Sequence, residues 1–118
     1  MEGFIIIQFN QVSKNYGATK ALDSIDLTIE KGEIHSLIGE NGAGKSTLIK
    51  ILCGVVNKDS GDIYYEGKKI LDFRPYSLLQ IGISAAFQEM SLFNNLTVAQ
   101  NLRVATLPQK KGFTINWK

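Results

Sequence analysis

Nine consecutive residues, Gly39 to Thr47, combine glycines with a lysine and two hydroxyl side chains. They fit the pattern G-x-x-x-x-G-K-[S/T] of a phosphate-binding loop. That pattern carries meaning only where a strand precedes it and a helix follows it. We predict both elements: a short, buried, Ile-rich strand over Glu33–Ile38 and a helix over Lys45–Cys53 that ends at Gly54.

The residue types in this loop suit a triphosphate. Gly42 and Gly44 have no Cβ, so their backbone N–H groups can come close to an anion. A helix beginning at Lys45 adds free N–H groups and the positive end of its dipole. We expect Lys45 to contact the β- and γ-phosphates, Ser46 to ligate Mg²⁺ and Thr47 to donate to the α-phosphate. The alternative is a glycine-rich turn that binds nothing.

Length and composition set outer bounds on the function. At 118 residues the chain has room for one small domain with a core. Its formal net charge of +2 is too small to indicate nucleic acid as a partner. Cys53 is the only cysteine, which excludes an internal disulfide and fits a reducing compartment. No apolar run reaches the length of a membrane span.

The remaining elements surround the loop. Two strands over Phe4–Phe9 and Ala21–Ile29 precede it and are expected to pair antiparallel. A turn at Lys31–Gly32 leads from them into the loop strand. The elements predicted after the loop are a hairpin over Asp62–Ile70 turning at Glu66–Gly67, a short helix over Phe73–Ile81, a buried strand over Ile83–Phe87 with Gln88 at its end, and a helix capped by Thr97 and Gln100.

These motifs in this order resemble the ATP-binding subunits of ABC transporters. Within that family the chain looks most like the ATPases of bacterial monosaccharide importers of the ribose, galactose and xylose type. The likeness spans nearly the whole chain and is carried by Gly39–Leu48, Gly61–Ile63 with Gly67, Gly82–Ile83, Phe87–Glu89 and Leu96–Leu102, with Leu92–Phe93 and Lys110–Trp117 as pointers to the subfamily.

The resemblance implies an α/β fold, the P-loop NTPase fold of ABC-type nucleotide-binding domains. Residues 1–118 would be its N-terminal part, truncated after an antiparallel β-subdomain and the start of the parallel core sheet. The ligands implied are ATP and Mg²⁺. The nucleotide would contact the residues Tyr16, Gly39, Asn41, Gly42, Ala43, Gly44, Lys45, Ser46 and Thr47.

The resemblance also assigns roles to single positions. Tyr16 falls where such subunits carry an aromatic side chain that stacks on adenine; the alternative is a half-buried packing aromatic in an edge strand. Gln88 matches the glutamine that senses Mg²⁺ and the γ-phosphate; the alternative is a polar strand end in water. The candidate catalytic residues are therefore Lys45 and Gln88, and the candidate metal ligands are Ser46 and Gln88.

Partners and location are implied in the same way. Residues 88–101 would face a transmembrane permease subunit, and a second ATP-binding subunit or domain would close on the first. A periplasmic sugar-binding protein would belong to the same system, and no nucleic acid is expected. The protein would be cytoplasmic and peripheral on the inner face of the cell membrane.

The chain lacks residues that ATP hydrolysis needs. Phosphoryl transfer to water requires a strand-end Asp for Mg²⁺ and a residue that orients the water. No Asp, Glu or His follows Glu89. We therefore expect an N-terminal fragment of a longer ATPase that hydrolyses no ATP alone. Two alternatives are a soluble ABC-type ATPase acting on DNA or ribosomes, and a small P-loop kinase, although Arg74 and Arg103 are too few for an arginine-rich lid.

Overall fold

A computed structural model describes residues 4–86 and 92–104 of the chain. It divides into two compact units, Met1–Ala85 and Ala86–Lys118. Within the described ranges, no helix combines the length and the hydropathy that crossing a bilayer requires.

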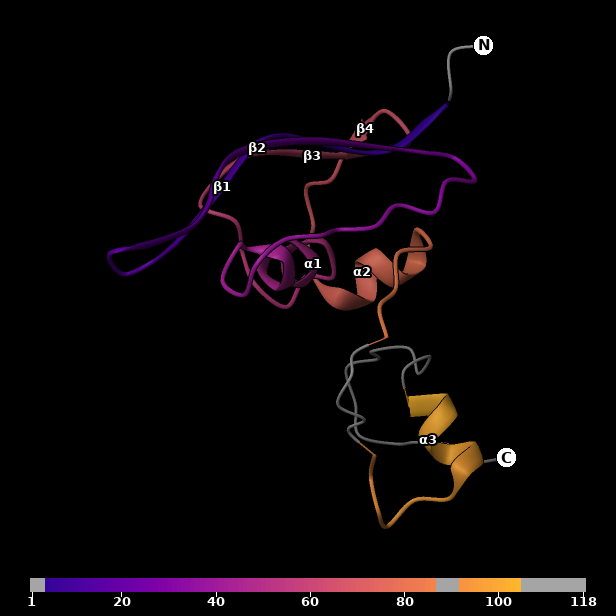
Figure 1. The fold of residues 1–118 in the computed structure, drawn as a ribbon. Helices are drawn as coiled ribbons and strands as arrows, with labels where there is room; N and C mark the ends of the chain where they lie inside the picture. The colour runs from indigo at the N-terminus through magenta and orange to yellow at the C-terminus, as the bar shows by residue number, and fades with distance from the viewer. Residues whose placement is uncertain (1–3, 87–91, 105–118) are drawn as a thin grey trace. The chain divides into compact units, whose positions relative to one another are not determined.

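The first unit contains a four-stranded antiparallel sheet in the order β2-β1-β3-β4 (Figure 1). The predicted pairing of the first two strands and the hairpin turning at Glu66–Gly67 are confirmed. The first hairpin is longer than predicted, because pairing continues to Tyr16↔Thr19 around Gly17. The strands are β1 (Ile5–Tyr16), β2 (Thr19–Glu30), β3 (Ser60–Tyr65) and β4 (Lys68–Lys69).

A bulge in β1 brings two core residues onto the same face of the sheet. Phe9 and Val12 are three positions apart, so strict alternation would point them to opposite faces. The pairing with β2 shifts register between them, and Gln11 takes a φ of 50°. Asp26 of β2 accepts a 2.8 Å hydrogen bond from the Gln11 backbone N–H and another from its side-chain amide. As a result, both Phe9 and Val12 are buried.

Helices α1 (Lys45–Leu52) and α2 (Pro75–Gln80) lie on one side of this sheet (Figure 1). Both helices were predicted within one or two residues of these bounds. Their apolar residues and those of the strands form one core, consisting of Phe9, Val12, Leu22, Leu48, Ile51, Ile63, Ile70, Leu78 and Ile83. The second unit holds α3 (Val98–Val104).

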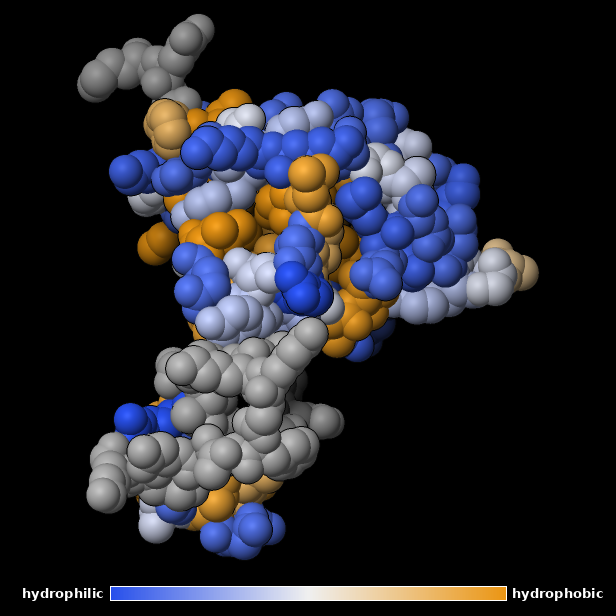
Figure 2. All heavy atoms as spheres, turned by 180° about the vertical axis from the view of Figure 1, so that it is seen from behind, coloured by the Kyte–Doolittle hydropathy of each residue, from blue (hydrophilic) through white to orange (hydrophobic). Residues whose placement is uncertain are grey.

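Two predicted strands are not formed. Glu33–Ile38 has no strand assignment, and Ile34 and Ile38 are 96% and 94% exposed instead of buried. In the described part of 83–87, only Ile83 is buried and no strand is assigned. Neither segment has a neighbouring strand among the described residues, so no ladder pairs its backbone. Apolar residues consequently reach the surface of the first unit, where Figure 2 shows them between polar regions.

Gly44, at the N-cap of α1, fixes the start of this helix against the sheet. Its φ is 83°, and a Cβ there would lie 2.3 Å from the carbonyl oxygen of Ala21 and 2.7 Å from Leu22 Cδ2. Real Cβ atoms essentially never come so close to other heavy atoms. The absence of a side chain therefore lets α1 begin in contact with β2.

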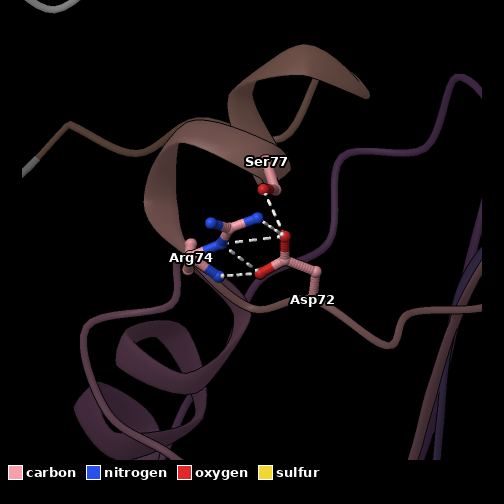
Figure 3. Close-up of polar contacts among 3 residues, drawn as sticks. All are labelled: Asp72, Arg74 and Ser77. Carbon is pink, nitrogen blue, oxygen red and sulfur yellow. Dashed lines mark hydrogen bonds and ion pairs between the residues drawn. The ribbon is translucent and has the colours of Figure 1, made fainter. Parts of the chain in front are cut away.

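A carboxylate organises the start of α2 (Figure 3). Asp72 accepts hydrogen bonds from the Arg74 backbone N–H at 3.0 Å and from Ser77 Oγ at 2.6 Å. The Arg74 guanidinium pairs with the same carboxylate at 2.6 Å. These bonds, led by the one from the Arg74 side chain, hold the pKa of Asp72 well below its usual 3.8. Together with Pro75 at the first helical turn, they fix where α2 begins.

We predict that Gly44→Ala destabilises the fold more than Gly42→Ala. Both glycines have positive φ, 83° and 89°, so the backbone strain of an alanine is similar at both. A Cβ at Gly42 meets nothing within 4 Å, whereas one at Gly44 collides with β2. The difference in free energy of unfolding should be about 1–3 kcal/mol, measured by urea denaturation. Equal losses in the two variants would contradict this packing.

We also predict that acid releases the start of α2. The folded-state pKa of Asp72 is depressed, so its stabilising contribution is complete above pH 3.8 and declines as the pH falls below that value. Amide exchange of residues 78–80 should accelerate as the pH falls below 3.8, after correction for intrinsic rates. Asp72→Asn should give fast exchange at every pH, and Ser77→Ala a smaller effect. A wild-type profile identical to that of Asp72→Asn would refute this account.

Candidate functional site

The N-terminus of α1 presents backbone N–H groups that have no acceptor. Gly44 at the N-cap supplies no side-chain hydrogen bond, and the first bond into the helix is Leu48 N–H to Gly44 O at 2.9 Å. The N–H groups of Gly44, Lys45, Ser46 and Thr47 therefore donate to nothing among the described residues. Several unpaired donors at one helix end attract an anion.

The Lys45 ammonium folds back onto the first residues of the loop. Its Nζ donates to the carbonyl oxygens of Gly39 at 2.6 Å and Glu40 at 2.7 Å. An ammonium group has three protons, so one remains for a further acceptor. The side chain is half-buried, which fixes the charge close to the unpaired N–H groups of the loop.

The other loop residues divide into packed and open positions. A Cβ at Gly39 would come within 3.3 Å of Ala43 Cβ, so these two residues lie close together, whereas the space beside Gly42 is open. Asn41 and Ser46 are exposed and Thr47 is half-buried. Within the described chain, the hydroxyls of Ser46 and Thr47 have no hydrogen-bond partner, so they remain available to a ligand.

Tyr16 lies at the same end of the first hairpin as this loop. It pairs with Thr19, and Ala21, which contacts the Gly44 position, comes two residues later in β2. Two residues of strand span about 7 Å. Tyr16 is 48% exposed, so part of its surface is open to solvent.

Two residues beside Tyr16, Lys14 and Asp59, were not predicted from the sequence as part of the site. Lys14 places its Nζ 5.5 Å from the centroid of the Tyr16 ring. The same ammonium pairs with Asp59 at 2.8 Å, and Asp59 also accepts the Asn15 N–H at 2.7 Å. The i, i+2 spacing in β1 could have indicated that Lys14 and Tyr16 share a face. Asp59 gives no such signal, because it lies 45 positions from Lys14 in the sequence.

Gln88 lies outside the described residues, as does the beginning of the segment 88–101. In the described part of that segment, Leu92 and Phe93 are 60% and 53% exposed. The predicted cap of the following helix is confirmed: Thr97 N–H donates to Gln100 Oε1 at 2.9 Å, and Gln100 N–H to Thr97 Oγ1 at 3.3 Å. The apolar side chains are thus presented on a turn joined to a capped helix.

Asn101 fixes that turn to α3. Its Oδ1 accepts the Phe93 N–H at 2.9 Å, and its Nδ2 donates to the carbonyl oxygens of Phe93, Leu96 and Thr97 at 3.1–3.2 Å. One side chain therefore bonds four backbone groups of a loop that lacks strand pairing, with its two amide protons shared among three carbonyl oxygens. This arrangement gives residues 93–101 a defined shape.

The loop geometry fits a phosphate-bearing ligand better than a metal held by protein alone. The described residues contain no cluster of three or more His, Cys, Asp or Glu that could hold a metal ion. They do contain unpaired N–H groups, a partly engaged ammonium and two free hydroxyls at one place. Such donors suit anionic oxygens, and a metal there would share those oxygens.

Sequence comparisons identify relatives of this architecture. Residues 22–117 match the family described as ABC transporter. The chain is 42% identical over 113 residues to the ribose import ATP-binding protein RbsA of Caldanaerobacter subterraneus, covering 96% of this chain and 23% of that protein. It is also 42% identical over 113 residues to the galactose/methyl galactoside import ATP-binding protein MglA of Clostridium tetani, covering 96% and 22%.

Solved structures agree with the sequence relatives. A nucleotide-free ATP-binding cassette from an ABC transporter superposes with a TM-score of 0.70 at 37% identity, covering 73% of this chain and 34% of that one. The ADP conformation of such a cassette gives 0.64 at 37% identity, covering 66% and 31%. The chain spans about a fifth of the length of the curated relatives named above. By its sequence and by its antiparallel sheet and loop-bearing helix, it belongs to the ATP-binding proteins of the ABC transporter family.

Proposed function

We propose that this chain is the ATP-binding part of the motor subunit of an ABC importer that takes up a sugar. In the complete protein, Mg-ATP would close two such subunits, and hydrolysis would reset them. The observation that carries the nucleotide proposal is the row of unpaired N–H groups from Gly44 to Thr47 beside the Lys45 ammonium. The names of the ribose and galactose import relatives support the sugar assignment.

Each loop residue has a role in this proposal. The four N–H groups bind the phosphate oxygens, and the remaining proton of Lys45 reaches the β- and γ-phosphates. Ser46 would hold Mg²⁺ together with phosphate oxygens and water, because Mg²⁺ prefers oxygen ligands and retains several waters. In the complete protein, Gln88 would provide a second contact to the metal and report the state of the γ-phosphate. Tyr16 stacks on the adenine ring at the hairpin end of the site.

Partner contacts follow from the second unit. Residues 88–101 would bind the transmembrane permease subunit, placing the protein in the cytoplasm on the inner face of the membrane. The exposed Leu92 and Phe93 on a turn held by Asn101 support this surface. A periplasmic sugar-binding protein would deliver the sugar to the permease. Neither partner is a nucleic acid.

We predict that Lys45→Ala weakens Mg-ATP binding about ten- to hundredfold, because it removes a charge-assisted contact to phosphate. Isothermal titration calorimetry of the 118-residue chain measures this affinity. Lys50→Ala is the matched control, since Lys50 lies in the last turn of the same helix and its loss should change little. Equal effects of the two substitutions would argue against the proposed phosphate site.

We also predict that the chain alone releases no phosphate from Mg-ATP above background. It contains no Asp, Glu or His after Glu89, so it lacks the strand-end carboxylate on which hydrolysis depends. A phosphate-release assay at saturating nucleotide provides the measurement. Turnover that disappears in Lys45→Ala would contradict the prediction.

A further inference from the structure

The Tyr16 ring has a cation over one face and is partly exposed to solvent. The Lys14 ammonium lies over one face of the ring, 5.5 Å from its centroid. The Lys14 side chain is only 15% exposed, whereas Tyr16 is 48% exposed. The cation therefore covers one side of the aromatic ring and leaves ring surface open to solvent.

Asp59 fixes the position of that cation. Its two carboxylate oxygens accept the Lys14 ammonium at 2.8 Å and the Asn15 backbone N–H at 2.7 Å. The Asp59 N–H donates in turn to the Ser13 carbonyl oxygen at 2.9 Å. The Lys14 hydrogen bond is the main reason why the pKa of Asp59 lies below its usual 3.8, so the ion pair is intact at neutral pH. The loop before β3 thus anchors the cation to the end of β1.

We infer that Lys14 is a positioning residue for the nucleotide base: held by Asp59, it fixes the Tyr16 ring from one face so that a purine stacks on the other. The inference rests on the proposed nucleotide site and extends it to base recognition. A ring that is already oriented loses less conformational freedom when the base binds. Cation–π attraction supplies the orientation, and the i, i+2 spacing on β1 supplies the geometry.

The test separates the base from the phosphates. Affinities of the 118-residue chain for Mg-ATP and for magnesium tripolyphosphate are measured by calorimetry. Wild type should bind Mg-ATP more tightly, because only ATP has a base to stack. Lys14→Met should weaken Mg-ATP about two- to tenfold and leave tripolyphosphate unchanged. Lys14→Arg should restore the ATP affinity, since a guanidinium also binds an aromatic face.

Lys20→Met is the matched control. Lys20 lies on the same hairpin and pairs with Asp23 at 3.0 Å, so this variant also removes one charge and leaves one carboxylate without its cation. Its ratio of ATP to tripolyphosphate affinity should equal that of wild type. A double variant Lys14→Met/Asp59→Asn should lose no more ATP affinity than Lys14→Met, because Asp59 acts through Lys14.

The contradictory outcomes are distinct. Equal weakening of both ligands by Lys14→Met would overturn the inference, because the lysine would then act by general charge attraction. Equal affinity of the wild type for both ligands would also overturn the inference about Lys14, but it would not contradict the proposed phosphate site. A chain that binds neither ligand would contradict the proposed function and this inference together.

Discussion

The backbone of Gly44 approaches β2 so closely that no side chain fits between them. This contact determines where α1 begins, and the start of α1 is where the unpaired N–H groups lie. If Gly44 were needed only to let a phosphate approach the backbone, it would not determine where the loop lies along the sheet. Gly44 has a second role: it lacks the Cβ that would collide with β2, and it adopts the left-handed conformation found at the N-cap of α1.

The β1–β2 hairpin connects the two ends of the candidate site, the phosphate loop and Tyr16. Its second strand contacts Gly44 through Ala21 and Leu22, and its first strand ends in Tyr16. The ion pair of Lys14 with Asp59 adds a connection from the end of β1 to the loop before β3. In the proposed site, the phosphates would be bound by backbone donors and the base by side chains, and both sets of groups depend on the same antiparallel strands. A sheet of this kind needs no ligand to hold its register, because its ladders and apolar core already do so.

Local signals in the sequence predicted most of this arrangement. Features that depend on residues far apart in the sequence were not predicted. The helix after the loop, the turn at Glu66–Gly67 and the cap of Thr97 with Gln100 each depend on a few adjacent residues, and each is confirmed. The prediction of a strand over Glu33–Ile38 was wrong, because apolar residues form a strand only where a neighbouring strand pairs with their backbone. Asp59 was missed because its partner is remote in sequence. Gln88 remains a prediction, since it lies outside the described residues.

The central claim is that backbone donors at the start of α1, and not the glycine pattern as such, make this chain a nucleotide-binding protein. Amide NMR spectra of the chain with increasing Mg-ATP test it most directly, because they observe those donors one by one. The account predicts that the N–H signals of Gly44, Lys45, Ser46 and Thr47 shift strongly and exchange more slowly with solvent, while those of α3 do not change. Shifts that leave these four groups unaffected at saturating nucleotide would contradict it.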